Sequence, residues 1–567
     1  MTTTGSTRLG NVLRQTGLFT DAQVEDLARS KRPEGQSLTE LAVNKGYAKE
    51  DTFLDALARA LNVQFVRLDN RTIEQAVLDL LPPKVVFQYN VIPLAVENGS
   101  LLVATHDPFN AEVFDALRLA AGMRVRVALS PLPDIKRAGK KFYGIGAETV
   151  EEMIEDNRIE VDLSETLLKT DLGELDQETS IVKFVNQVIW EAYNESATDI
   201  HLEPMEDSLR IRYRIDGILH QTPLPAQLNR FQAAIISRIK VMANMNIAEK
   251  RLPQDGRIGM RIKGEDLDIR VSTMPTVYGE SVSLRLLMRG KGLITLAELG
   301  MADRDAQIIR TLINRPNGII LVTGPTGCGK STSLYAYLHE INRIDQRILT
   351  IEDPIEYEMP GVNQVQLRDE IGLTFASALR SFLRQDPDVL MVGEIRDLET
   401  AEIAIRASLT GHLVFSTLHT NDSPGAITRL LDMGVEPFLV ASSLRAVVAQ
   451  RLVRRLCRDC RLPFTPDESV LRGAKLPTII PAGSTVFEAK GCEKCHMTGY
   501  KGRAGIYEVL RVTEELDAVI VAREPTSKIK QKAVSLGMRT LREDGWGKVL
   551  GGLTTIDEII SASEEDA

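Results

Sequence analysis

The chain has 567 residues, of which 43% are apolar and 26% charged, a composition that is ordinary for a soluble globular protein. Its length predicts three or four domains, and its net charge of −10 argues against non-specific binding to nucleic acid. Because the first residues show no secretory signal, no apolar run is long enough to span a membrane, and the cysteines number five, we expect a reduced, cytoplasmic protein.

Residues 1–65 predict short helices arranged as a duplicated pair. The segments "RLGNVLRQTG" and "SLTELAVNKG" align with an offset of 29 residues, and each precedes another helical pattern. Residues 66–145 change to short strands and helices, and the alternation in "VIPLAVENGSLLVATHDP" predicts a hairpin. We take residues 1–145 as an N-terminal domain and the acidic stretch 146–179 as a mobile, partly helical linker.

Two α/β domains follow the linker. Residues 180–292 predict a small one, with strands at "LRIRYRIDGIL" and "LDIRVSTM". Residues 293–567 predict a larger one, in which we place a cysteine-rich subdomain at 452–510 and C-terminal helices at 511–567. The chain is therefore predicted to be a multidomain α/β protein.

The stretch "GPTGCGKST" matches the phosphate-loop pattern G-x-x-x-x-G-K-S/T, with an apolar strand pattern before it and a helical pattern after it. Glycines let backbone N–H groups point at phosphate oxygens, Lys330 reaches the β- and γ-phosphates, and the Ser331 hydroxyl ligates Mg²⁺. We therefore expect ATP with Mg²⁺, and we give Cys328 no role of its own. The predicted nucleotide-binding residues are Gly324, Pro325, Thr326, Gly327, Cys328, Gly329, Lys330, Ser331 and Thr332.

Carboxylates and histidines lie at the ends of strands after this loop. Glu394 follows the apolar run "VLMV" and is predicted to bind metal and water, while Glu356 follows the strand in "LTIEDPIEYE". Such acids are often surface charge, but their position at strand ends favours the site. His412 and His419 bracket the strand in "TGHLVFSTLHTN", which predicts a γ-phosphate sensor, with a structural role as the alternative.

Four of the five cysteines form two C-x2-C pairs, "CRDC" and "CEKC", separated by 31 residues. Thiolates in such pairs fit tetrahedral Zn²⁺. A redox pair is the alternative, and the presence of a second pair argues against it. His496 adjoins the last cysteine and competes as a ligand. The predicted zinc ligands are Cys457, Cys460, Cys492 and Cys495.

These motifs, in this order, resemble those of the secretion ATPases, which include the type II secretion ATPase and the type IV pilus assembly ATPase. The stretches "SATDIHLEP", "RYRIDG" and "RLPQDGRIGMRI" extend the match, which covers roughly 180 to 560. The resemblance implies a RecA-like P-loop ATPase core with a preceding small, PAS-like α/β domain, a tetracysteine zinc subdomain and an N-terminal helical plus α/β domain. It also implies a homo-hexameric ring in which ATP lies between the small domain and the core.

The resemblance further assigns residues. Arg270 in "DIRVST" and Arg285 in "VSLRLL" match arginines that neutralise charge on the transferred phosphoryl group. Glu356 matches the general base and Glu394 its metal and water partner, and the sequence leaves open which glutamate abstracts the proton. Secondary matches are Arg380, Arg384, Arg396 and Arg429, whose alternative roles are salt bridges.

The leading function is a motor that hydrolyses ATP to drive pseudopilus assembly in type II secretion, and pilus assembly is the alternative. The end of the chain, "GMRTLREDGWGKVLGGLTTIDEI", looks closer to the secretion branch. A nucleic-acid motor or binding module, with the zinc unit as a DNA knuckle, is the alternative from another class. The acidic charge and the lack of aromatic-rich basic stretches argue against it, so no nucleic-acid partner is expected.

The helical repeat resembles a cyclic di-GMP motif given twice in relatives, R-L-G-x-x-L-x-x-x-G. The first copy keeps Arg8 and Gly10, but the second has Ser37 and Thr39 at the corresponding positions. The lost charge-assisted contact and the lost close approach at glycine should weaken binding about a thousandfold. We therefore expect this domain to dock inner-membrane assembly and platform proteins, which would hold the chain peripherally at that membrane.

Overall fold

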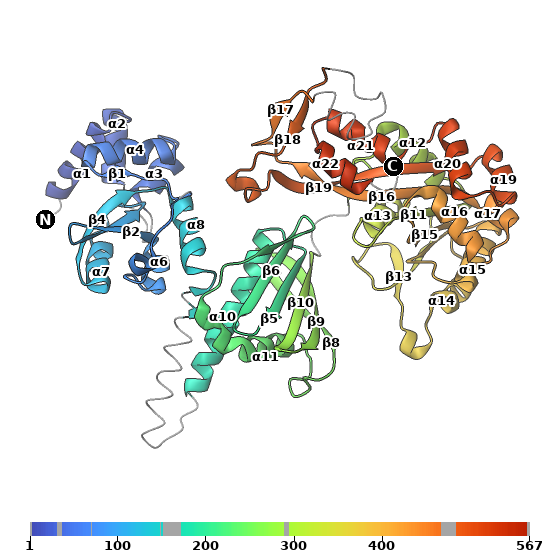
Figure 1. Cartoon of the computed structure of the whole chain (residues 1–567), viewed down its shortest axis with the longest axis horizontal. Helices are drawn as coiled ribbons and strands as arrows, with labels where there is room; N and C mark the ends of the chain where they lie inside the picture. The colour runs from blue at the N-terminus through green and yellow to red at the C-terminus, as the bar shows by residue number, and fades with distance from the viewer. Residues whose placement is uncertain are drawn as a thin grey trace. The chain divides into compact units, whose positions relative to one another are not determined.

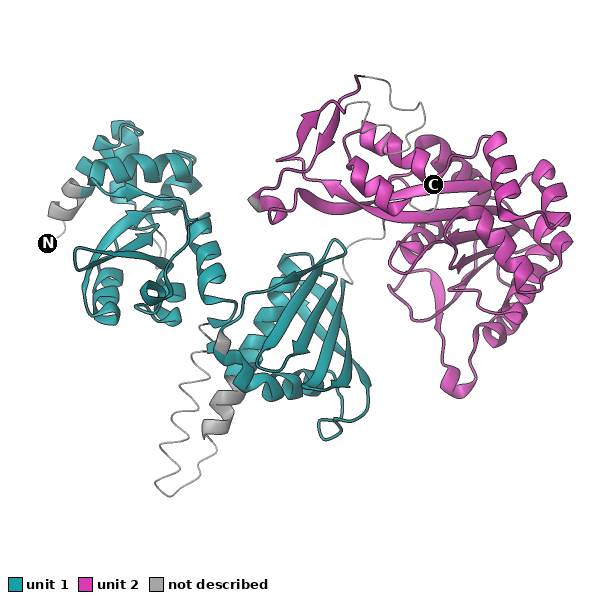
Figure 2. Ribbon diagram, in the orientation of Figure 1, with its two compact units in different colours: residues 1–288 teal, residues 289–567 magenta. Residues whose placement is uncertain are grey.

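The computed structural model of the chain forms two compact units, Met1–Met288 and Arg289–Ala567 (Figure 2). The predicted linker 146–179 lies largely outside the described residues, and its last part belongs to helix α10 (Leu172–Asn194). In the described part of the chain, no helix is long and apolar enough to cross a membrane. The structure describes residues 3–30, 37–69, 71–147, 149–150, 172–288, 294–466 and 483–563.

The first unit begins with two helix pairs, as the repeat predicts. The side chains of Thr20 and Ser37 cap the second and third helices, each in a reciprocal capping box with the residue three positions later. Leu13, Phe53 and Leu57 lie in the shared apolar core. The helices are α1 (Thr3–Gln15), α2 (Asp21–Arg29), α3 (Leu38–Asn44) and α4 (Glu50–Leu61).

A four-stranded sheet with the order β1-β4-β3-β2 follows these helices. The predicted hairpin is confirmed: β2 and β3 pair antiparallel, and Asn98 and Gly99 both take positive φ in the two-residue turn. Its elements are β1 (Gln64–Phe65), α5 (Gln75–Leu78), α6 (Pro83–Tyr89), β2 (Val91–Glu97), β3 (Ser100–Thr105), α7 (Ala111–Ala121), β4 (Arg124–Leu129) and α8 (Leu132–Tyr143).

The rest of the first unit is a six-stranded antiparallel sheet with the order β7-β6-β5-β10-β9-β8 (Figure 1). Helices α10 and α11 cover one face, where alternate aliphatic side chains of the strands form a core. The elements are β5 (Asp199–Pro204), β6 (Leu209–Ile215), β7 (Ile218–Gln221), η1 (Ala226–Phe231), α11 (Gln232–Met242), β8 (Gln254–Ile262), β9 (Glu265–Thr276) and β10 (Gly279–Met288).

The second unit is built on a seven-stranded sheet with the order β13-β12-β14-β15-β11-β16-β19. The first six strands in this order run parallel, and the last, β19, pairs antiparallel with β16. The strands β11, β12, β14 and β15 are buried along their whole length because helices cover both faces of the sheet. The strands are β11 (Gly318–Thr323), β12 (Ile348–Glu352), β13 (Val362–Gln366), β14 (Val389–Val392), β15 (Leu413–Leu418), β16 (Leu444–Leu456) and β19 (Tyr500–Arg511).

Helices α12 and α13 pack on one face of this sheet, and α14 to α17 pack on the other. This three-layer arrangement is the RecA-like core that the family resemblance implies. The helices are α12 (Asp303–Ile313), α13 (Lys330–Ile341), η2 (Asp369–Ile371), α14 (Phe375–Phe382), α15 (Leu398–Leu409), α16 (Ser423–Asp432) and α17 (Pro437–Ser443).

The cysteine-rich segment extends from the far ends of β16 and β19. Trp546 of a C-terminal helix is fully buried against these strands and joins them to the last helices. The remaining elements of the second unit are β17 (Leu462–Phe464), β18 (Val486–Glu488), η3 (Glu493–Cys495), α19 (Glu514–Val521), α20 (Thr526–Ser535), α21 (Leu541–Leu550) and α22 (Ile556–Ala562), of which α19 and α20 pack with α16 and α17.

Candidate nucleotide and metal sites

The phosphate loop joins β11 to α13, and its glycines permit its curl. Gly324, Gly327 and Gly329 all take positive φ. A Cβ atom at Gly324 would lie 2.5 Å from the carbonyl oxygen of Gln450, so the strand behind the loop leaves no room for a side chain. Residues 325–327 and Ser331 are exposed, so the loop presents its backbone and the start of α13 to solvent. This cradle fits a polyphosphate.

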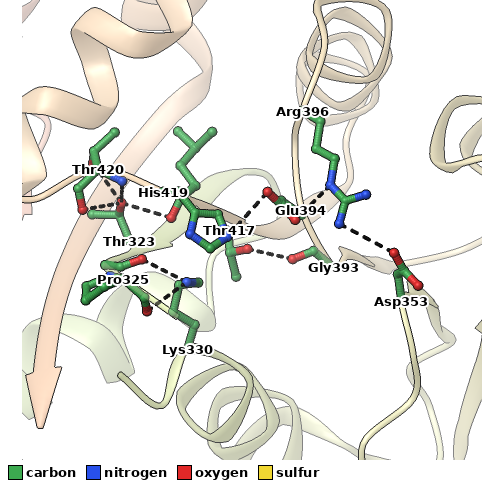
Figure 3. Close-up of polar contacts among 12 residues, drawn as sticks. Thr323, Pro325, Lys330, Asp353, Gly393, Glu394, Arg396, Thr417, His419 and Thr420 are labelled. Carbon is green, nitrogen blue, oxygen red and sulfur yellow. Dashed lines mark hydrogen bonds and ion pairs between the residues drawn. The ribbon is translucent and has the colours of Figure 1, made fainter. Parts of the chain in front are cut away.

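Lys330 begins helix α13 and stays beside the loop. Its Nζ donates hydrogen bonds to the carbonyl oxygens of Gly324, at 2.8 Å, and Pro325, at 3.2 Å (Figure 3). Burial lowers the pKa of Lys330, while the negative charge of Glu394 acts in the opposite direction. Cys328 is buried on the inner side of the loop, and burial raises the pKa of its thiol. The Lys330 side chain thus lies along the backbone of the loop.

Gln450 of β16 supports the loop from behind. Its side-chain Oε1 accepts a hydrogen bond of 2.7 Å from the Ser333 hydroxyl of α13, and its Nε2 would lie 2.9 Å from a Cβ atom at Gly329. The residue is fully buried. No sequence motif marked Gln450, because an isolated glutamine in the strand "VVAQRLV" carries no pattern.

Glu394 follows the end of β14, as predicted. The preceding Gly393 is anchored at both backbone groups: its N–H donates to the Ile351 carbonyl at 2.8 Å, and its carbonyl accepts from the Thr417 hydroxyl at 2.7 Å. The Glu394 carboxylate accepts a 2.9 Å hydrogen bond from Arg396. The backbone before Glu394 is therefore anchored to both strands that flank β14, and Arg396 holds the carboxylate (Figure 3).

The two predicted histidines lie at opposite ends of β15. His419 follows the carboxyl end, and its Nε2 is 3.4 Å from a carboxylate oxygen of Glu394. His412 precedes the amino end, where its Nδ1 lies 2.8 Å from the Ala407 carbonyl oxygen near the end of α15. Since β15 runs parallel to β11, the structure brings His419, and not His412, to the edge that carries the phosphate loop.

Glu356 lies in the loop after β12, beyond a buried carboxylate. Glu352 ends that strand and is 4% exposed, and it accepts hydrogen bonds from Thr350, Gln364 and Tyr335. The Glu356 backbone N–H donates to the Tyr335 hydroxyl at 3.1 Å. Because β12 and β14 are parallel neighbours, Glu356 and Glu394 follow the same edge of the sheet.

The predicted arginines lie on both units. Arg270 and Arg285 are directly paired across β9 and β10 in the first unit, and the Arg285 Nε is 3.0 Å from an Asp199 carboxylate oxygen. In the second unit, Arg396 contacts Glu394, whereas Arg380 pairs with Glu399 of the adjacent helix. The Arg380–Glu399 contact is a salt bridge, which is the alternative role predicted for the secondary arginines.

The four paired cysteines meet in one cluster. Their sulfur atoms all lie within 4.8 Å of one another, and His496 is not part of this cluster. The Cys495 sulfur accepts hydrogen bonds from two backbone N–H groups, those of Cys492 at 3.1 Å and Gly499 at 3.2 Å. Four converging thiols with backbone donors to sulfur fit a tetrahedral thiolate site for Zn²⁺.

A parallel sheet with a phosphate loop after one strand and a carboxylate after the next strand but one, at the same edge, defines a P-loop ATPase. The sequence is more specific: residues 174–561 match the model of the family described as "Type II/IV secretion system protein", and the chain belongs to this family. Residues 61–149 match the MshEN domain. The family resemblance drawn from the motifs is thereby confirmed, and the chain is an ATP hydrolase.

The relatives include both branches of the family. A type IV pilus assembly ATPase PilB of Myxococcus xanthus is 39% identical over 565 residues, which cover 99% of this chain and 100% of that protein. A type II secretion system protein E of Xanthomonas campestris is 40% identical, covering 95% of this chain and 96% of that protein. The type II secretion system ATPase E of Vibrio cholerae is 48% identical over 70% of this chain and 78% of that protein.

Among solved structures, the DotB ATPase of Yersinia pseudotuberculosis aligns with a TM-score of 0.50 at 19% identity, covering 68% of this chain and 93% of that chain. At this identity the likeness concerns the fold alone. It agrees with the mixed α/β architecture described above.

Proposed function

We propose that this protein is the cytoplasmic motor that drives pseudopilus assembly in type II secretion. It belongs to a family of secretion and pilus ATPases, so ATP hydrolysis follows from its family. What we propose is the process that this hydrolysis drives. The observation that carries its catalytic part is the grouping of Lys330, Glu394 and His419 at one edge of the sheet. The acidic charge of the chain continues to disfavour nucleic acid as the substrate.

In this proposal the second unit supplies the hydrolytic groups. Backbone N–H groups of the loop and Lys330 hold the phosphates, and Ser331 and Glu394 hold Mg²⁺. When bound, Mg²⁺ neutralises charge on the phosphate oxygens. Glu356 accepts the proton of the attacking water. His419, which lies beside Glu394, acts as the γ-phosphate sensor.

The first unit would complete the site in an assembled homo-hexamer. Arg270 and Arg285 are guanidinium groups on a rigid sheet, and forked donors of this kind neutralise charge that develops on a transferred phosphoryl group. Because they lie on a different unit from the phosphate loop, their engagement would link the nucleotide state to domain closure. This linkage is the step at which hydrolysis becomes movement.

The N-terminal domain would dock the motor peripherally at the inner membrane, through assembly and platform proteins. The second helix pair is poorly suited to cyclic di-GMP. Ser37 is 3% exposed and caps α3, and Thr39 is 2% exposed with its hydroxyl 3.3 Å from the His106 carbonyl oxygen. Both side chains thus have structural partners, which supports a protein-docking role over a nucleotide-binding one.

Pilus assembly is the second candidate, and one observation favours it. The Myxococcus pilus assembly ATPase aligns with 99% of this chain, against 95% for the Xanthomonas secretion protein. Replacing the chromosomal gene with a Lys330→Ala form tests both candidates in the organism. Loss of secreted enzymes with normal pili supports type II secretion, whereas loss of surface pili with normal secretion supports pilus assembly. DNA-stimulated ATPase activity of the purified protein would contradict both.

A further inference from the structure

We propose that Tyr335 is a positioning residue for ATP hydrolysis. Its hydroxyl fixes the loop that carries Glu356 onto the helix that begins with Lys330. The inference rests on the proposed role of Glu356 as the general base, and it assigns the group that sets the position of that base relative to the phosphates.

Tyr335 lies on α13, and its side chain is 2% exposed. Its hydroxyl donates a short hydrogen bond to the Glu352 carboxylate. The same oxygen accepts hydrogen bonds from the backbone N–H groups of Glu356, at 3.1 Å, and Tyr357, at 3.5 Å. Its ring also meets the Tyr357 ring edge-on, with 5.8 Å between centroids. One side chain therefore contacts the end of β12 and the backbone of the loop after it.

The donor and acceptor roles of this hydroxyl are fixed by its partners. Glu352 is a buried acceptor that also receives hydrogen bonds from the Thr350 hydroxyl, at 2.6 Å, and the Gln364 amide, at 3.1 Å. Because the single hydroxyl proton of Tyr335 points to this carboxylate, its lone pairs face the two amides. The arrangement leaves each of these groups with a partner, and the loop backbone has one favoured position.

The geometry links Lys330, at the phosphate loop, to the loop that carries Glu356. Tyr335 and Lys330 lie five residues apart on one helix, about 7.5 Å along its axis. The Tyr335 hydroxyl thereby fixes the Glu356 backbone relative to helix α13, whose first turn holds the phosphates in the proposed function. A general base must lie within hydrogen-bond reach of the attacking water, so a small displacement of this loop lowers the rate of chemistry. Binding of ATP at the phosphate loop does not need this contact.

Tyr337 provides a matched control on the same helix. Its side chain is also fully buried, and its ring lies 6.2 Å from the Phe415 ring between centroids. Within the described residues, its hydroxyl makes no hydrogen bond. Phenylalanine at either position keeps the ring and removes one oxygen, so the two variants differ in the hydrogen bonds that are lost.

The experiment measures kcat, KM for ATP and thermal unfolding for the full-length protein with Mg²⁺. We expect Tyr335→Phe to lower kcat about tenfold or more, with KM and nucleotide affinity within about twofold of the parent values. Tyr337→Phe should keep the parent kcat. If Tyr335→Phe does not fold, Glu352→Gln replaces it, because it weakens the same hydroxyl contact while keeping the side-chain shape.

A double-mutant cycle separates this inference from the assignment of the base. If Tyr335 acts through Glu356, Tyr335→Phe should have little further effect in a Glu356→Gln protein. A Glu356→Gln protein with parent kcat would overturn the base assignment and this inference together. A slow Glu356→Gln protein beside a Tyr335→Phe protein with parent kcat would overturn this inference alone. Equal losses in Tyr335→Phe and Tyr337→Phe would also overturn it, since they would indicate a general packing effect.

Discussion

The imidazole Nε2 of His419 lies 3.4 Å from the Oε1 atom of Glu394, while Arg396 donates to the other carboxylate oxygen at 2.9 Å. Each carboxylate oxygen therefore has its own partner: Arg396 follows β14, and His419 follows β15. We expect Glu394→Gln to bind ATP and to hydrolyse it at least about a hundredfold more slowly, because the amide keeps the shape and loses the charge. Glu399→Gln, an exposed acid on α15, is the control.

Turnover and nucleotide binding must be measured separately for this variant, with a fluorescent ATP analogue for the binding step. Parent turnover in an assembled Glu394→Gln protein would contradict the metal and water role of this residue.

Lys330→Ala should abolish ATP turnover, because it removes the cation that reaches the β- and γ-phosphates. Steady-state phosphate release measures the loss. The matched control is Lys528→Ala, an exposed lysine paired with Glu524 far from the loop in sequence. Residual turnover within about tenfold of the parent rate would mean that another cation serves the phosphates.

The cysteine cluster should bind about one Zn²⁺ per chain, as expected for four thiolates. Cys492→Ser should lower the zinc content and expose residues 452–510 to proteolysis, while nucleotide affinity stays near the parent value. Metal analysis together with limited proteolysis tests this. Four free thiols and no metal in a fully active, protease-resistant protein would exclude a structural zinc site.

Arg270→Ala and Arg285→Ala should each reduce turnover while leaving nucleotide binding largely intact, because guanidinium groups stabilise developing charge more than bound ATP. The control is Arg257→Ala, which lies directly opposite Arg270 but on the edge strand β8. Turnover per chain should also rise with protein concentration as the ring assembles. A monomer with full, concentration-independent activity would rule out the proposed assembly.

Cyclic di-GMP should bind the full-length protein weakly, with an affinity about a thousandfold below that of a relative with both motif copies intact. Isothermal titration calorimetry measures this directly. Ser37→Arg would restore the missing charge, but it would also remove the side-chain cap of α3, so it does not test the charge alone. Micromolar or tighter binding by the parent protein would show that the second motif copy is not needed.

Local patterns predicted much of this site. The phosphate loop, the carboxylate after β14 and the paired cysteines each depend on residues close together in sequence, so their spacing carries the chemistry. Tyr335 and Gln450 were missed because their roles arise from strand order: the first needs the end of β12 beside α13, and the second needs β16 behind the loop. Neither residue type belongs to a motif.

Strand direction decided between the two histidines. In a parallel sheet the residues that follow the strands share one edge, and those that precede them share the other. His419 follows β15 and meets Glu394, whereas His412 precedes it and contacts the end of α15. The bracketing pattern alone treated both ends as equivalent, although a strand about 20 Å long separates them.

Strand β16 carries Gln450 against the back of the phosphate loop, and Cys457 follows directly after its end. The seven residue steps from Gln450 to Cys457 span about 23 Å of extended chain. One continuous strand therefore contacts the phosphate loop near its middle and leads directly into the thiol cluster at its end. Loss of the metal at the cysteines would therefore loosen the end of the same strand that supports the phosphate loop.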